Sequence, residues 1–159
     1  MVGQKTKKIK NEIIIKTSNF INLKMEKNYK DWHKKKTKIN EIIKTPFFHE
    51  REIWFCYIGH NIGFEQDGDE DFLRPIVIFR KFDNDIFWAI PLTKSKNIKP
   101  KSKKVQKYYF NFSFLKGVES SAILSQIKLI DVKRLSHHVG SISEDDFDKL
   151  KQKLKELLP

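Results

Sequence analysis

Cysteine, glycine and proline are all scarce in this chain. The single cysteine, Cys56, excludes an internal disulfide and a metal site built on several thiolates. Six glycines and five prolines among 159 residues argue against a disordered or low-complexity chain. No stretch approaches the roughly 18 apolar residues of a membrane helix, and the apolar stretch at 13–15 is too short for a signal peptide. We therefore expect a cytoplasmic protein that does not associate with membranes.

Several familiar cofactor and metal sites are also missing. The glycines never approach the spacing of a phosphate-binding loop. The five histidines do not form a helical metal pair, and the adjacent His137 and His138 would point to opposite faces of a strand. The acidic segment 65–71 is similar to a calcium loop, but Ile76 stands where such a loop carries its bidentate glutamate. We expect neither a cofactor nor a metal.

Positive charge, in contrast, is abundant and concentrated. The net charge is +12, and residues 1–48 hold thirteen lysines against four acidic residues. Residues 94–107 hold seven lysines and no acidic residue. Such a field attracts polyanions, nucleic acid first among them. An AT-rich genome would also enrich lysine, but the clustering favours nucleic acid.

Residues 1–48 predict a basic helical extension. Pro46 is expected to end its helix, because the residue before a proline avoids the α conformation. The helix is free to pack on its own domain, on a second subunit or along phosphates. Its mostly apolar stripe recurs at spacings of four and three and consists of Met25, Tyr29, Trp32, Lys36, Ile39 and Ile43.

Residues 49–159 predict a second unit that is mainly β, with a C-terminal helix. Ser143 can cap that helix, which is expected over residues 143–158. Asp83-Asn84 predicts a tight hairpin between two strands. Both faces of the strands are rather apolar, which favours a small, closed or half-closed barrel. The expected strands are 52–58, 74–82, 85–93, 107–114 and 121–130.

Polar residues at strand ends are the candidates for a binding site. Arg74 opens a strand beside the acidic loop, and Thr93 ends the next strand before the lysine-rich segment. Ser125 and Gln126 interrupt an otherwise apolar strand. From spacing alone, ordinary structural roles, such as pairing of Arg74 with the acidic loop, explain these residues better than a binding site does.

Short motifs in a specific order resemble the MazF/PemK family of toxins over about residues 50–158. The resemblance implies an SH3-like, MazF/PemK/CcdB-like β-barrel with flanking helices, a homodimer, and an endoribonuclease silenced by an antitoxin. The motifs are Arg51-Glu-Ile-Trp-Phe, Gly63-Phe-Glu-Gln-Asp-Gly, Arg74-Pro-Ile-Val-Ile, Ile90-Pro-Leu-Thr, residues 121–131, Lys133-Arg-Leu and Gly140-Ser-Ile-Ser.

The resemblance also implies roles for individual residues. Arg74 and Thr93 match the catalytic pair of the family, and Gln126 matches a glutamine that contacts RNA. Glu65 and Gln66 match its acidic loop pair. Two positions depart from the family: Phe64 replaces a small hydroxyl residue, and Ser125 replaces an aspartate of the PemK branch, so that branch's acid–base scheme is not expected here.

These roles predict metal-free cleavage of single-stranded RNA by its own 2′-hydroxyl, with Glu65 as the candidate base and no assigned acid. The alternatives are a non-catalytic nucleic-acid-binding barrel and a gyrase-poison-like toxin that targets protein. The second lacks support, because no tryptophan stands in the last third of the chain. The expected RNA contacts are Gln66, Lys94, Lys101, Lys103, Lys104, Ser125, Gln126 and Lys128.

Overall fold

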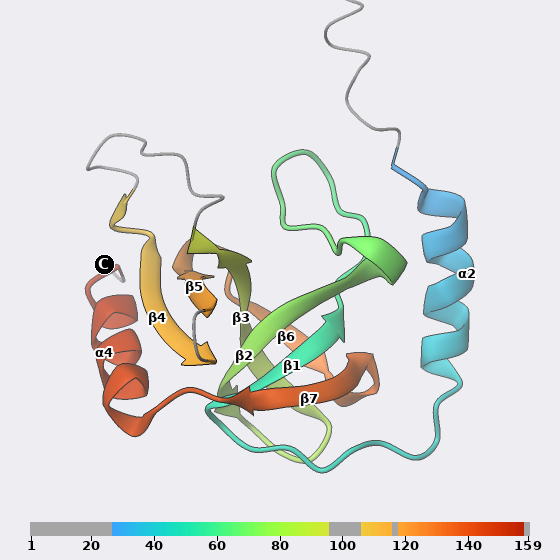
Figure 1. The fold of residues 1–159 in the computed structure, drawn as a ribbon. Helices are drawn as coiled ribbons and strands as arrows, with labels where there is room; N and C mark the ends of the chain where they lie inside the picture. The colour runs from blue at the N-terminus through green and yellow to red at the C-terminus, as the bar shows by residue number, and fades with distance from the viewer. Residues whose placement is uncertain (1–26, 96–105, 116–117, 158–159) are drawn as a thin grey trace, which may run out of the picture.

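The computed structural model describes residues 27–95, 106–115 and 118–157. Seven strands form one mainly antiparallel sheet in the order β4-β5-β3-β2-β1-β7, with β6 paired to β3. A helix lies on each side of this strongly curved sheet (Figure 1). The strands are β1 (Glu52–Tyr57), β2 (Leu73–Lys81), β3 (Ile86–Lys94), β4 (Tyr109–Leu115), β5 (Val118–Ile123), β6 (Lys128–Asp131) and β7 (Leu135–Ser141). The helices are α2 (Tyr29–Asn40) and α4 (Glu144–Lys155), with 3-10 turns η1 (Glu70–Phe72), η3 (Leu124–Gln126) and η4 (Val132–Arg134).

The prediction of a small barrel-like sheet with flanking helices is confirmed, although the sheet stays open. No pairing of β4 with β7 closes it within the described residues. The first four predicted strands correspond to β1 to β4 with ends shifted by at most two residues. The predicted hairpin joins β2 to β3, where the Asp83 carboxylate accepts hydrogen bonds from the amides of Asp85 and Ile86, both at 2.8 Å.

The fifth predicted strand, residues 121–130, is wrong. The turn η3 interrupts it, so β5 pairs with β4 and the second half of β3, while β6 pairs with the first half of β3. The pairings of β5 and β6 with β3 differ in register by three residues, and the chain takes up this difference in η3, where Ser125 is exposed. The strand β7 was not predicted at all.

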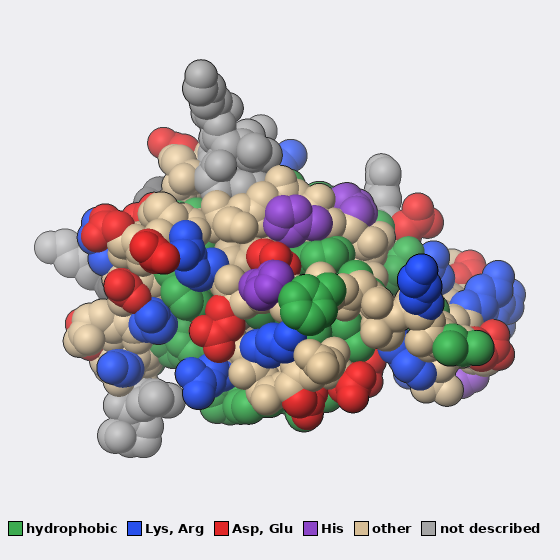
Figure 2. All heavy atoms as spheres, turned by 90° about the horizontal axis from the view of Figure 1, so that it is seen from below, with side chains coloured by type: hydrophobic (Ala, Val, Ile, Leu, Met, Phe, Trp, Pro, Cys, Tyr) green, Lys and Arg blue, Asp and Glu red, His purple; other side chains and the backbone are tan. Residues whose placement is uncertain are grey.

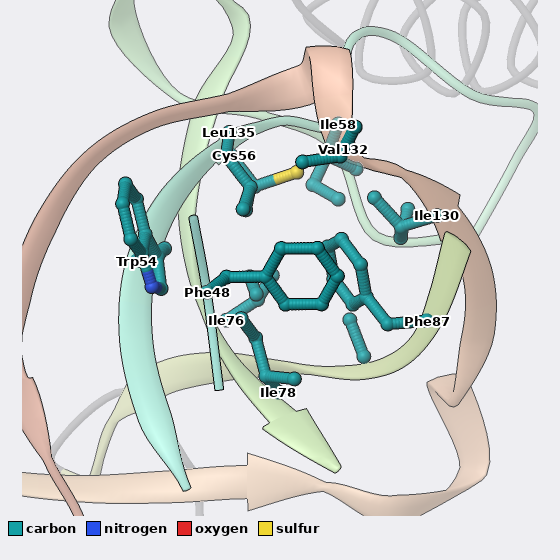
Figure 3. Close-up of a cluster of buried hydrophobic side chains, with 11 residues drawn as sticks. Phe48, Trp54, Cys56, Ile58, Ile76, Ile78, Phe87, Ile130, Val132 and Leu135 are labelled. Atoms are coloured by element: carbon teal, nitrogen blue, oxygen red, sulfur yellow. The ribbon is translucent and has the colours of Figure 1, made fainter. Parts of the chain in front are cut away.

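The sheet buries an apolar cluster on each face. The first cluster surrounds Phe48 and Phe87, whose rings lie 4.9 Å apart in the hollow of the sheet (Figure 3). The second lies on the other face, which α4 covers with Phe147 and Leu150. Ser143 caps α4 as predicted, because its hydroxyl accepts a hydrogen bond from the Asp146 amide at 3.1 Å.

The N-terminal helix is shorter than predicted. It ends at Asn40, six residues before Pro46, and the Lys133 ammonium donates a hydrogen bond to the Asn40 carbonyl at 2.9 Å. Trp32 and Ile39 are buried as their stripe predicts, but Ile43 is 97 % exposed beyond the helix. Met25 lies outside the described residues. Of the three positions left open for this helix, the structure shows packing on its own domain. No helix among the described residues is long and apolar enough to cross a membrane.

Candidate functional site

Three polar side chains continue the concave face of the sheet beyond its apolar core. Arg74 stands two residues before buried Ile76 in β2, and Lys128 two residues before buried Ile130 in β6. Thr93 ends β3, opposite Arg74 when the observed β2–β3 register is extended. Alternate residues of a strand share a face. All three side chains therefore lie on the face that carries the first apolar cluster, with Arg74 and Thr93 together and Lys128 opposite Ala89, four residues from Thr93 along β3.

Arg74 is held from three sides. Its Nε donates to the Asp67 carbonyl, its Nη1 donates to the Leu92 carbonyl at 3.3 Å, and its Nη2 donates to Asp69 Oδ1 at 3.0 Å. Its side chain is only 13 % exposed, whereas Asp69 is 77 % exposed. A guanidinium has five N–H donors. One N–H on each terminal nitrogen thus remains without a partner among the described residues, which suits a bidentate phosphate contact.

Lys128 brings a second cation to the same face. It is half-buried and forms no hydrogen bond or ion pair with another described residue. Burial lowers the pKa of its ammonium, and the carboxylates of Glu65 and Asp67 oppose that shift. The negative charge of Glu65 therefore favours the charged form of Lys128. The Glu65 carboxylate itself accepts a hydrogen bond from the Ile62 amide at 3.2 Å. No described contact joins Glu65 to Arg74 or Thr93.

The loop over residues 59–72 brings Gln66 to Gln126. The Gln66 amide donates to Gln126 Oε1 at 3.4 Å, so the loop and η3 meet beside the site. Asn61 folds this loop: its amide donates to Asp67 Oδ1, and its Nδ2 donates to the Gln66 carbonyl, both at 2.5 Å. Sequence reasoning missed Asn61, because it lies in the loop four residues after β1 and not at a strand end.

A polar row across β3, β5 and β4 was also missed. Thr93 pairs with Ser121, which in turn pairs with Asn111. The Ser121 hydroxyl donates to Asn111 Oδ1 at 2.6 Å and lies 2.9 Å from the Ser95 hydroxyl. Directly paired residues of an antiparallel sheet share a face. The available signal was the Ser-Ser pair within an otherwise apolar segment.

The remaining candidates are not drawn into this group. Lys94 follows Thr93 directly and so points to the other face of the sheet. Ser125 is exposed in η3. Lys101, Lys103 and Lys104 lie outside the described residues. At the opposite end of the molecule, basic and acidic side chains are interspersed, so no field of one sign covers that face (Figure 2).

A family model describes the domain that carries this site. Residues 49–158 match the model of the PemK-like, MazF-like toxin of type II toxin-antitoxin systems. The chain belongs to this family. The match begins after α2, so the helical extension lies outside it. The resemblance predicted from the ordered motifs is confirmed.

Solved structures of MazF toxins are similar in fold. The Mycobacterium tuberculosis toxin MazF-mt6 is 13% identical, with 67% of this chain and 94% of that chain covered and a TM-score of 0.47. MazF from Deinococcus radiodurans is 16% identical, with 72% of this chain and 97% of that chain covered and a TM-score of 0.49. An endoribonuclease in complex with its cognate antitoxin from a mycobacterial species is 13% identical, with 74% of this chain and 98% of that chain covered and a TM-score of 0.45. A comparison with curated proteins gives no match.

Proposed function

We propose that this chain cleaves single-stranded RNA at the open end of the concave face, without a metal or cofactor. The RNA's own 2′-oxygen attacks the adjacent phosphorus and the bond to the 5′-oxygen breaks. The products are a 2′,3′-cyclic phosphate and a free 5′-hydroxyl. The proposal rests on the position of Arg74. Three hydrogen bonds orient its guanidinium opposite Thr93, and two of its N–H donors have no partner among the described residues.

Charge stabilisation is the main task left to the protein, because the substrate supplies the nucleophile. Arg74 is the proposed partner of the phosphorane oxygens, since its planar fork matches two of them and stays charged at any working pH. The Thr93 hydroxyl donates to the same group. Lys128 adds a second positive charge on the same face.

Proton transfer is the less constrained part of the proposal. Glu65 is the proposed base that accepts the 2′-hydroxyl proton, and the departing 5′-oxygen takes its proton from solvent water, because no residue is assigned as the general acid. The Glu65 carboxylate is exposed and has no described contact with Arg74, so the proposal includes a movement of the 59–72 loop when the substrate binds. The ion pair between Arg74 and the exposed Asp69 is the contact that an incoming phosphate would displace.

Base selection and protein partners complete the proposal. Gln66 and Gln126 already meet beside the site, and we assign them to reading unstacked bases. The family's description supports an antitoxin as the partner, and the net charge of +12 supports an acidic one. An exposed patch on the outer face of the sheet supports a homodimer: Phe82 and Trp88 lie 5.2 Å apart, and Leu129 is paired with Trp88.

The test is cleavage of a long single-stranded RNA in the presence of EDTA. Arg74→Ala and Thr93→Val are each expected to slow cleavage by about 10²–10³-fold, as loss of one preorganised donor does. Arg80→Ala is the matched control, because Arg80 lies on the same strand with an exposed side chain. Circular dichroism before each assay separates loss of chemistry from loss of folding.

The reaction products decide between the alternatives. A cyclic phosphate end, and no cleavage after a 2′-deoxy substitution at the cut site, would support attack by the RNA's own hydroxyl. Cleavage of the 2′-deoxy substrate would refute it. RNA that is bound but never cut would point to a non-catalytic binding module, and the absence of both binding and cleavage to a protein target.

A further inference from the structure

A pocket of about 520 Å³ lies between α2 and the sheet. This volume falls within the range of about 300–1,000 Å³ that is typical of ligand pockets. Its polar walls come from three parts of the chain, and α2 lies outside the region that matches the family model. The polar lining residues are His33 and Lys36 from α2, His60 and Asn61 after β1, and Lys128 and Arg134 from β6 and η4.

The pocket is basic, and no acidic residue is among the described residues that line it. Lys36 and Lys128 form no ion pair with another described residue. Arg134 is fixed in place, because its Nη1 donates to the Tyr57 carbonyl at 2.9 Å and its guanidinium lies over the Trp32 ring at 5.6 Å. The carboxylates of Glu65 and Asp67 favour the charged form of Lys128, although neither residue lines the pocket.

One buried polar atom in the pocket wall has no partner. The ring of His60 is wedged between Tyr29 and Phe72, with ring centroids at 6.2 and 5.0 Å. Its Nδ1 is buried and forms no hydrogen bond within the described residues. A buried polar atom of this kind is normally satisfied. His60 itself lines the pocket, so its ring reports on what binds there.

We propose that this pocket binds a phosphate group of the RNA strand, next to the one that is cut. The inference rests on the proposed function and extends it to a second phosphate subsite. Lys128 connects the two, because it lines the pocket and also continues the concave face that carries Arg74 and Thr93. Asn61 connects them a second time, because it lines the pocket and bonds to Gln66 beside Gln126.

The lining chemistry fits a phosphate of the backbone. Lysine ammoniums act as point charges toward phosphate, and an arginine donates from a fixed plane. An acidic peptide would also be attracted by this charge. The continuity of the pocket with the face that carries Arg74 favours the RNA strand, which must extend past the cut on both sides.

The experiment measures binding of the full chain to a fully 2′-O-methylated RNA, which has no free 2′-hydroxyl to attack. Fluorescence anisotropy over a series of salt concentrations gives the slope of log Kd against log salt. Lys36→Gln and the double variant Lys36→Gln/Lys128→Gln are compared with Lys38→Gln, an exposed lysine of the same helix that does not line the pocket. For single strands, each lost phosphate contact reduces the slope by about 0.7.

We expect the slope to fall by about 0.7 for the double variant, which loses one phosphate contact. The fall should be no larger for Lys36→Gln, and Lys38→Gln should not change the slope. Slopes of all variants equal to that of Lys38→Gln would overturn the proposal. So would tight binding of inorganic phosphate, or of an oligoglutamate peptide, that depends on Lys36 and Lys128 while RNA binding does not. Such binding of inorganic phosphate would indicate a small-anion site, and such binding of the oligoglutamate peptide would indicate a protein partner.

Cleavage of unmodified RNA by the same wild-type preparation separates the two proposals. Cleavage with unchanged salt slopes would refute the pocket alone. Binding that depends on Lys36 without any cleavage would refute the nuclease and support the pocket as an RNA site. The histidine Hε1 resonance of His60, assigned with His60→Gln, gives a second readout: it should shift on addition of RNA and stay in place in the double variant.

Discussion

Gly59 lies against Trp32 where the helical extension meets the sheet domain, and this contact predicts a strong energetic coupling. Gly59 has a φ of +82°, and a Cβ added there would lie 2.0 Å from Trp32 Cε2. Trp32 is 6 % exposed and also packs against Phe72, with ring centroids at 5.3 Å. Gly59→Ala therefore has to strain the backbone and displace the indole.

The magnitude follows from two separate costs. A non-glycine residue in the left-handed region costs about 1–3 kcal/mol, and overpacking costs about another 1–3 kcal/mol. Gly59→Ala should thus destabilise the folded chain by about 2–6 kcal/mol. Trp32→Ala should itself cost about 3–5 kcal/mol. In the Trp32→Ala background the clash is gone, so Gly59→Ala should cost only the backbone part, about 1–3 kcal/mol.

Urea unfolding of the wild type, both single variants and the double variant measures this coupling, expected at about 1–3 kcal/mol. Gly63→Ala is the matched control: its φ is +61°, but nothing lies within 4 Å of its added Cβ. It should show the backbone cost and no coupling to Trp32. Additivity of Gly59→Ala and Trp32→Ala within about 0.5 kcal/mol would refute the docking of α2 on this loop.

Two further predictions concern Cys56 and Lys27. Burial raises the pKa of the Cys56 thiol to about 12, from a usual value of 9.0; as pH rises from 9.0, the thiol ionises in the unfolded chain first. Relative to Cys56→Ala, the free energy of unfolding should therefore fall between pH 9.0 and about 12. At neutral pH, iodoacetamide should label Cys56 only when the protein unfolds. Fast labelling of the folded protein would contradict this burial. Lys27→Met removes the 2.8 Å ion pair with Asp67, and hydrogen exchange in the 59–72 loop should accelerate by less than about tenfold; unchanged exchange would show that this ion pair does not restrain the loop.

The elements that sequence predicted well are those whose signals are local. The Ser143 cap and the stripe of Phe147 and Leu150 specify α4 without reference to any other part of the chain. The predicted strands that became β1 to β4 carry β-branched and aromatic residues on a buried face. Arg74 and Thr93 were found because each marks the end of such a strand.

The elements that sequence missed depend on partners distant in the chain. Among the described strands, β7 pairs only with β1, and as an edge strand it exposes His137 and His138, so its apolar signal is weak. The break at Ser125 is required because the pairings of β5 and β6 with β3 differ in register by three residues, which the apolar run of residues 121–130 does not reveal. The stripe of α2 predicted a buried face but not that Gly59 would receive Trp32.

The extension and the candidate site are joined by a chain of direct contacts. Lys27 forms an ion pair with Asp67, and the carbonyl of Asp67 accepts a hydrogen bond from Arg74. On the same loop, the Tyr29 hydroxyl donates to the Asn61 carbonyl at 3.2 Å. The sequence pattern changes after residue 48, and the family match begins at residue 49. These contacts nevertheless cross that boundary. Because a guanidinium must be oriented to within a fraction of an ångström to stabilise a transition state, the residues that restrain the loop also restrain Arg74. In this chain the helical extension therefore helps to position the residue on which the proposed chemistry depends.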